Sequence, residues 1–348
     1  MPKTSPSCSA NSGNPLNVLI LSVSAKGGLV KAFRESSNAN RIVGVDADAY
    51  APAGQLCDRF YTIPKQTHPT CLEKIQALCQ RESIDLIIPT REDDIAFLNQ
   101  NPNVFQAKIA TCSSECFHIC NNKWETQAWL TKHNFQAPPT LRAEYAKADM
   151  PFTEFPLIAK SPTGSGSRGI EMLKKPQDIR NIPDHWLIQP LLNGNEYTLN
   201  AYVDMQGHCV TLIPHARIRV QEGEVSQGLT VRNQVLIELG TQIAEALPGA
   251  YGPMTIQVFF DTLSSHLAVT DINPRFGGGY PLVHRSGARF TEWLIQEAQG
   301  MTLPHPFTAW ENNLMILRYR ESLFFKKDAP GPNSPSESLQ HLSLEKGP

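Results

Sequence analysis

Short apolar runs alternate with helix-like segments over residues 15–112, and this alternation limits the fold more than any other feature. The apolar runs are NVLILSV (17–23), RIVGVDAD (41–48), IDLIIPT (84–90) and KIAT (108–111). The intervening residues 29–36 and 70–82 have helical character. Strands that alternate with helices usually form a parallel sheet. We therefore predict a small parallel α/β domain over residues 15–112.

The first turn of this domain, SVSAKGG (22–28), can be compared with a dinucleotide-binding loop, with Asp46 as the acid that would follow it. That fingerprint requires G-x-G-x-x-G, for a tight turn and close approach of the pyrophosphate. Only Gly27 and Gly28 are present. The sequence favours a structural α/β domain over a dinucleotide site.

Beyond Thr111 the pattern becomes mixed. A helical stretch over 113–134 is followed by helices over about 233–247 and 291–299, and by strands over 155–160, 185–192, 196–204, 209–220, 255–261, 266–274 and 314–325. We predict an α+β region with antiparallel strands.

Charge and hydropathy exclude several classes of partner. The net charge of −2 and the pI of about 6.6 give no basic excess for nucleic acid or a membrane surface. No apolar run approaches the roughly 20 residues of a transmembrane helix. The polar N-terminus does not read as a secretory signal. We expect a cytoplasmic protein with disordered tails over 1–14 and 328–348.

Three of the eight cysteines recur every four residues, at Cys112, Cys116 and Cys120, so a helix would place them on one face. A metal site would need more ligands, and His118 is the nearest candidate. The sequence favours small buried residues at the start of a helix.

Polar residues gather on a predicted hairpin over 255–274. If its tip lies at Leu263-Ser264-Ser265, cross-strand partners sum to about 528, so Gln257 faces Asp271. Asp271 and Asn273 share a face, and three oxygen donors then converge as Mg²⁺ prefers. Arg275, two residues further, could reach phosphates bound to that ion.

Three other pieces suggest nucleotide binding, although each also has a structural interpretation. Lys160 ends a strand and precedes a glycine-serine loop, TGSGSRG (163–169), whose backbone N–H groups could cradle phosphates. The stretch IQPLLNGNE (188–196) could bind an adenine edge through its backbone and ribose through Glu196. Lys123 begins a helix, where a lysine is usually solvated.

In this order the four pieces resemble the ATP-grasp superfamily, and especially a single ATP-grasp unit of the carbamoyl phosphate synthetase large chain and related single-unit amino-acid ligases. The resemblance covers about 15–325. Residues 44–64 and 84–98 resemble the domain that precedes ATP-grasp in those proteins. The resemblance implies a Rossmann-like pre-ATP-grasp domain (15–112) and a two-lobed ATP-grasp domain with antiparallel sheets (113–327, lobes about 113–190 and 191–327).

The resemblance also implies residue roles. Lys123 and Lys160 match the lysines that contact ATP phosphates, and Arg275 matches the arginine that stabilises the transferring phosphate; Lys160 and Arg275 are the expected catalytic residues. Gln257, Asp271 and Asn273 match ligands of Mg²⁺, with Mn²⁺ as the alternative, although Glu is commoner at the first two positions. The remaining nucleotide-binding positions match Gly164, Ser165, Gly166, Ser167, Gly169, Gln189, Pro190, Leu191, Leu192 and Glu196.

For the substrate we expect Gly277, Gly278 and Gly279 to give open access to the backbone, and Arg217 and Arg219 to fork onto a carboxylate from one strand face. Arg285 and His284 are weaker candidates. The resemblance implies a carboxylate–amine ligase that makes an acyl phosphate from a small acid, such as an amino acid, and transfers it to an amine. An ATP-dependent carboxylase or phosphoryl transferase, or a non-catalytic nucleotide-binding protein, is the alternative. Homodimers are common among such proteins.

Overall fold

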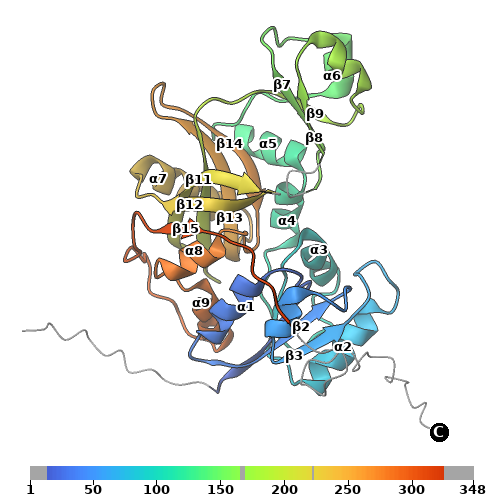
Figure 1. The fold of residues 1–348 in the computed structure, drawn as a ribbon, viewed down its shortest axis with the longest axis vertical. Coiled ribbons are helices and arrows are strands. Elements are labelled where there is room, and N and C mark those ends of the chain that lie inside the picture. The colour runs from blue at the N-terminus through green and yellow to red at the C-terminus, as the bar shows by residue number, and fades with distance from the viewer. Residues whose placement is uncertain (1–13, 165–168, 222, 325–348) are drawn as a thin grey trace, which may run out of the picture.

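In a computed structural model, the chain is described over residues 14–164, 169–221 and 223–324 (Figure 1). The predicted tails, apart from Asn14, lie outside the described residues. Ser165, Gly166 and Ser167 of the glycine-serine loop also lie outside them.

The N-terminal part is a five-stranded parallel sheet with the order β3-β2-β1-β4-β5. Its strands are β1 (Leu16–Ile20), β2 (Ala39–Asp46), β3 (Arg59–Thr62), β4 (Leu86–Ile88) and β5 (Lys108–Ile109). Its helical segments are α1 (Gly27–Arg34), the 3-10 helix η1 (Pro52–Leu56), α2 (Cys71–Arg81) and α3 (Glu92–Gln100). The parallel α/β prediction is confirmed.

The two faces of this sheet bury different helices because successive strand residues point to opposite sides. Val18 and Ile20 of β1 pack in one core with α1, whereas Leu19 packs in another with α2 and α3. The first core also contains residues of α8 (Tyr280–Arg285) and α9 (Phe290–Ala298) from the C-terminal part. The N-terminal sheet and the C-terminal helices therefore share one hydrophobic core, and Figure 1 shows α8 and α9 beside α1.

Strand β3 was not among the strands predicted from apolar runs. It is a four-residue edge strand whose sequence, RFYT, contains a charged and a polar residue, so it lacks a strong apolar signal. The turn that suggested dinucleotide binding is held by Asp46, whose carboxylate accepts hydrogen bonds from the N–H groups of Ser24 (2.8 Å) and Asp48 (3.0 Å). These bonds support the structural interpretation of Asp46.

The helical stretch over 113–134 is two helices, α4 (Ser114–Asn121) and α5 (Lys123–Lys132). The side chain of Asn122 accepts a hydrogen bond from the Trp124 N–H and caps α5, which makes Lys123 the first helical residue. Cys112, Cys116 and Cys120 are buried in the core beneath α4, and His118 is exposed. The structure thus agrees with the prediction of a packing role for these cysteines.

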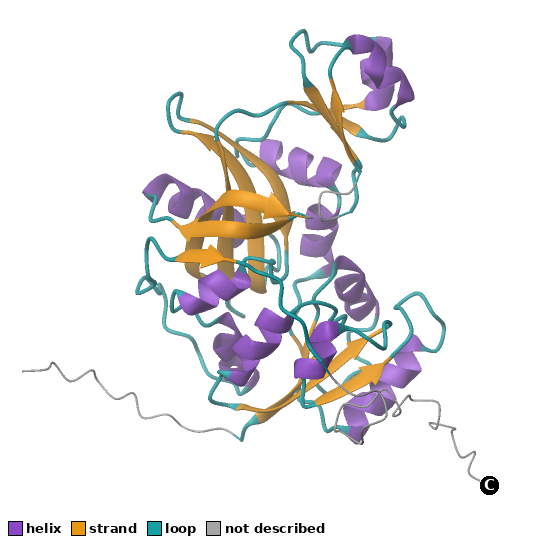
Figure 2. Ribbon diagram, in the orientation of Figure 1, coloured by secondary structure: helices purple, strands orange, loops and turns teal. Residues whose placement is uncertain are grey.

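The rest of the chain contains two antiparallel sheets (Figure 2). The small sheet has the order β6-β9-β7-β8 and comprises β6 (Leu141–Arg142), β7 (Leu157–Lys160), β8 (Ile170–Leu173) and β9 (Leu187–Pro190), with α6 (Ala143–Ala148) and η2 (Pro176–Asn181). The large sheet has the order β14-β13-β10-β11-β12-β15 and comprises β10 (Asn195–Val203), β11 (Cys209–Gln221), β12 (Glu224–Thr230), β13 (Gly252–Asp261), β14 (His266–Asn273) and β15 (Met315–Leu317), with α7 (Gln234–Ala246).

The final strand is shorter than the predicted 314–325. Only Met315–Leu317 pair with β12, and Tyr319 and Phe324 are exposed. Among the described residues, no helix is both long and apolar enough to cross a membrane.

Candidate active site

A cleft of about 480 Å³ lies between the two antiparallel sheets and the N-terminal domain. Ligand sites typically have volumes of about 300–1,000 Å³. Each predicted site residue that the structure describes lines this cleft, with the exception of Arg219 and of the weaker candidates His284 and Arg285. Residues separated by more than 150 positions in the chain therefore meet in one space.

The hairpin β13–β14 supplies the acidic side of the cleft. Gln257 is opposite Asp271, so the predicted register is confirmed at this point. Nearer the tip, Val258 pairs with Val269, and an irregularity at Thr270 shifts the register by one residue. The bulge matters because a one-residue slip would move a side chain to the other face of the sheet.

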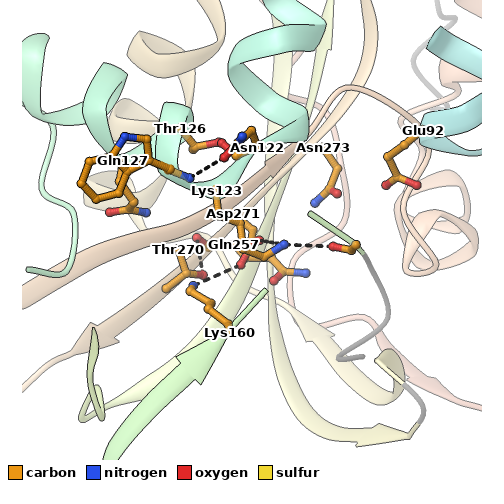
Figure 3. Close-up of polar contacts among 12 residues, drawn as sticks. Glu92, Asn122, Lys123, Thr126, Gln127, Lys160, Gln257, Thr270, Asp271 and Asn273 are labelled. Atoms are coloured by element: carbon orange, nitrogen blue, oxygen red, sulfur yellow. Dashed lines mark hydrogen bonds and ion pairs between the residues drawn. The ribbon is translucent and has the colours of Figure 1, made fainter. Parts of the chain in front are cut away.

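Two lysines approach Asp271 from different elements (Figure 3). Lys123 Nζ from α5 lies 3.3 Å from Oδ1, and Lys160 Nζ from β7 lies 3.9 Å from Oδ2. Lys123 also donates a hydrogen bond to the Gly164 carbonyl, at 2.9 Å. Burial lowers the pKa of Lys160, and the Asp271 carboxylate partly offsets this effect. Two cations and one carboxylate thus surround the part of the cleft beside Gly164.

The donor set on the hairpin suits Mg²⁺. Gln257, Asp271 and Asn273 offer amide and carboxylate oxygens, which are hard ligands of the kind that this ion prefers. All three are half-buried, whereas Ile272 between two of them is buried, as alternation on one strand face requires. These residues fit a magnesium ion that retains water or phosphate oxygens.

Gln189 and Glu196 also line the cleft. The Gln189 side chain donates a hydrogen bond to Thr140 Oγ1 (2.7 Å), so its amide group already has a partner. Glu196 Oε2 lies 3.3 Å from Arg217 Nε. Burial raises the pKa of Glu196, and the Arg217 guanidinium opposes that shift.

Arg217 and Arg219 do not lie together in the cleft. Arg217 is half-buried, lies next to Glu196 and donates to the Gly223 carbonyl (3.1 Å), whereas Arg219 is exposed. The register of β11 against β12 shifts on both sides of Arg219, which interrupts the alternation on which the prediction rested. Likewise, Arg285 and His284 do not line the cleft.

The three consecutive glycines line the cleft, but they serve packing more than open access. A Cβ atom added at Gly277, Gly278 or Gly279 would lie 2.6–2.8 Å from side-chain atoms of Thr255, Glu224 or His215. Only residues without a Cβ allow this segment to lie so close to the large sheet.

His215 was missed by the sequence analysis. It is 1% exposed, its Nδ1 lies 2.9 Å from Asn200 Nδ2, and its Nε2 has no hydrogen-bond partner among the described residues. Because the Asn200 amide can only donate at Nδ2, Nδ1 is the acceptor and Nε2 carries the proton. Burial, with smaller effects of Arg217 and Arg318, lowers the pKa of His215 to about 3.

The N-terminal domain contributes Lys26, Arg91 and Glu92, which sequence reasoning also missed. Glu92, the first residue of α3, accepts hydrogen bonds from Arg275 at Nε (2.8 Å) and Nη2 (2.5 Å). Burial would raise the pKa of Glu92, but Arg275 holds it below its ordinary value. Burial, followed by the nearby Arg275, lowers the pKa of Lys26. The predicted phosphate-binding arginine is therefore paired with the other domain.

Comparison with known proteins agrees with this arrangement. Residues 18–112 match the PylC-like, N-terminal domain, and residues 120–279 match an ATP-grasp domain. A curated relative, the uncharacterized protein MG011 homolog of Mycoplasma pneumoniae, is 25% identical over 89 residues. That match covers 24% of this chain and only 30% of the relative.

Several solved structures share the fold at low sequence identity. The biotin carboxylase domain of the Hydrogenobacter thermophilus 2-oxoglutarate carboxylase, solved with MgADP, ADP and bicarbonate, has a TM-score of 0.68 and 14% identity over 87% of this chain and 74% of its own. N5-carboxyaminoimidazole ribonucleotide synthetase from Thermotoga maritima has a TM-score of 0.63 and 18% identity, covering 84% and 78%. L-amino acid ligase from Bacillus licheniformis has a TM-score of 0.63 and 14% identity, covering 83% and 75%.

Proposed function

Since the chain is an ATP-grasp protein with a PylC-like N-terminal domain, we propose that it is an ATP-dependent carboxylate–amine ligase whose acid substrate is an amino acid. One observation carries the proposal: the carboxylate of Asp271 lies between Lys123 and Lys160, opposite Gln257, in a cleft large enough for a ligand. This combination of cations and oxygen donors suits a metal-bound polyphosphate.

In the proposed complex, the adenine lies along the backbone of Gln189 to Leu192 and the ribose lies near Glu196. Lys123 and Lys160 bind phosphate oxygens. Gln257, Asp271 and Asn273 hold Mg²⁺, which would neutralise phosphate charge and orient the leaving group.

The substrate carboxylate oxygen attacks the γ-phosphorus, the bond from this phosphorus to the bridging oxygen breaks, and ADP leaves with the electron pair. Arg275 and the two lysines, Lys123 and Lys160, stabilise the charge on the transferring phosphoryl group. The amine nitrogen then attacks the acyl carbon, the bond from carbon to phosphate oxygen breaks, and phosphate leaves as the nitrogen gives its proton to solvent.

An amino acid suits the N-terminal side of the cleft because both signs of charge are present there. Lys26 and Arg91 could bind a carboxylate, and Glu224 could bind an ammonium group. Glu224 also accepts a hydrogen bond from Arg318 Nη1 at 2.7 Å, so an ammonium group would share this carboxylate with Arg318.

The proposal is tested by ADP release from the full-length protein with Mg-ATP and amino acids, added singly and in pairs. Hydroxylamine is added in parallel, because it traps an acyl phosphate as a hydroxamate. We expect ADP release to require an amino acid together with an amine, and a hydroxamate to form when hydroxylamine replaces that amine.

Asp271→Asn should abolish turnover, whereas Asp261→Asn, at the exposed tip of the same hairpin, should not. ADP release that depends on bicarbonate instead would identify a carboxylase, and a phosphorylated product without an amine would identify a phosphoryl transferase. ATP binding without turnover on the whole panel would identify a binding protein. Each of these results contradicts a ligase.

A further inference from the structure

A second cluster of ligand-type side chains lies away from the cleft, at Asp204, His208 and His305. Asp204 and His208 flank the turn between β10 and β11, and His305 lies in the segment after α9. Asp204 is eight positions along the chain from Glu196, which corresponds to about 26 Å of strand at about 3.3 Å per residue. The cluster is therefore distinct from the predicted nucleotide and magnesium positions.

Asp204 is held rigidly and is almost fully buried, with 1% of its surface exposed. Its Oδ1 accepts hydrogen bonds from the N–H groups of Gln206 and His208, both at 2.9 Å, which fix the turn. Its Oδ2 accepts no hydrogen bond from any described residue. A buried carboxylate oxygen without a donor is unfavourable. His208 Nδ1, at 3.4 Å, forms an ion pair with this oxygen only when the imidazole is protonated, so beside a neutral His208 the oxygen is available to a cation.

The two histidines provide nitrogen donors beside that oxygen. His208 Nδ1 lies 3.4 Å from Asp204 Oδ2, and the His305 ring is stacked on the His208 ring with centroids 4.5 Å apart. One ligand atom from each of the three residues lies within 4.8 Å of the others. Ligands at about 2.0–2.1 Å in a tetrahedral zinc site are about 3.3 Å apart, so small rotations of the two exposed imidazoles would close the set.

The segment that carries His305 is hydrogen-bonded to β11, the strand that follows the turn with His208. The Phe307 N–H donates to the Val210 carbonyl (2.6 Å), and Thr211 Oγ1 donates to the Phe307 carbonyl (2.7 Å). The backbone thus holds His305 near the turn without help from the histidine ring. The three potential ligands are therefore close together before any ion binds.

We propose that Asp204, His208 and His305 bind a transition-metal ion, with Zn²⁺ as the expected occupant and water in the fourth position. Two imidazoles and one carboxylate suit a borderline cation better than Mg²⁺, which prefers oxygen ligands. The cluster and the hairpin donors of the cleft therefore differ in metal preference. The ion would fasten the segment after α9 to the β10–β11 turn.

The test uses the full-length protein after treatment with a chelator. Calorimetric titration with ZnCl₂ should give one site per chain, and CoCl₂ should give the visible absorption of tetrahedral Co²⁺. His208→Asn and His305→Asn should each weaken zinc binding by roughly tenfold or more, because loss of even an outer-shell partner typically costs about 10–100-fold. The double variant should lose the site, whereas His266→Asn, at the exposed first residue of β14, should bind zinc as the unaltered protein does.

Thermal unfolding with and without zinc provides a second readout that does not depend on ATP turnover. Zinc should raise the Tm of the unaltered chain and of His266→Asn, but not that of the double variant. Zinc binding that is equal in the unaltered and double-variant proteins would overturn the proposal. If no zinc binds but the Tm changes between pH 5 and 7 in a way that requires both histidines, the cluster binds protons and not a metal ion. That result would also overturn the proposal.

Discussion

Replacement of the buried His215 by asparagine should make the stability of the folded chain less sensitive to acid. His215 is 1% exposed, and its pKa is lowered from 6.5 to about 3, first by burial and then by Arg217 and Arg318. Between these two values the unfolded chain binds a proton at this residue and the folded chain does not. Stability is therefore fully present above pH 6.5 and is lost as the pH falls toward 3.

The size of this effect follows from the same two values. A pH of 5 lies 1.5 units below the ordinary histidine pKa of 6.5. At about 1.36 kcal/mol per unit, protonation of the unfolded chain therefore lowers the free energy of unfolding by about 2 kcal/mol relative to neutral pH. His215→Asn keeps an oxygen to which Asn200 can donate and removes the proton-binding group. The variant should lose about 2 kcal/mol less than the unaltered protein between pH 7.5 and pH 5.

Urea unfolding, followed by tryptophan fluorescence at the two pH values, measures this double difference. His185→Asn is the matched control, because His185 is exposed. Other groups titrate equally in both proteins and cancel. If His215→Asn and the unaltered protein lose the same free energy of unfolding between pH 7.5 and pH 5, the assignment of a neutral buried His215 is wrong.

Three further predictions concern the cleft. Asp271→Asn should lower kcat for ADP release by about 100-fold or more with an unchanged Tm, because it removes the charge that holds Lys123 and would bind Mg²⁺; activity within tenfold of normal would contradict the metal assignment. Glu92→Gln should lower the KM for ATP by about fivefold, since Arg275 no longer has a charged partner in the other domain; an unchanged or higher KM in steady-state assays would refute this. Arg217→Ala should weaken ATP binding in calorimetry by about tenfold, whereas Arg219→Ala should change it less than twofold, because only Arg217 reaches the cleft; equal effects of the two variants would contradict this difference.

Features that depend on local sequence were predictable. The strands of the N-terminal sheet, apart from β3, and the long helix α7 coincide with apolar patterns, and the apolar residues at the centres of β1, β2 and β4 are buried as the patterns require. The register that brings Gln257 opposite Asp271 was predicted correctly from an assumed tip. The bulge at Thr270 was not predicted, because one extra residue in a strand has no strong signal in a single sequence.

Features that depend on long-range packing were not predictable. No local sequence pattern around Lys26 or at the start of α3 indicates that these segments reach a cleft that residues 123–279 also line. The burial of His215 depends on a glycine segment more than 60 residues away. The three consecutive glycines were expected to give open access to the backbone. In the structure, the absence of their Cβ atoms instead allows close contacts with the large sheet, which are long-range contacts.

In the proposed complex the Arg275 guanidinium would bind phosphate, and the same guanidinium pairs with Glu92 of the N-terminal domain. Phosphate binding and domain contact are then linked equilibria, and whatever strengthens one weakens the other by the same factor. A substitution, solute or partner that weakened the Arg275–Glu92 contact would raise the affinity for ATP without contacting ATP. Conversely, ATP that bound Arg275 would break its ion pair with Glu92 at the start of α3. The position of the N-terminal domain would then depend on bound nucleotide.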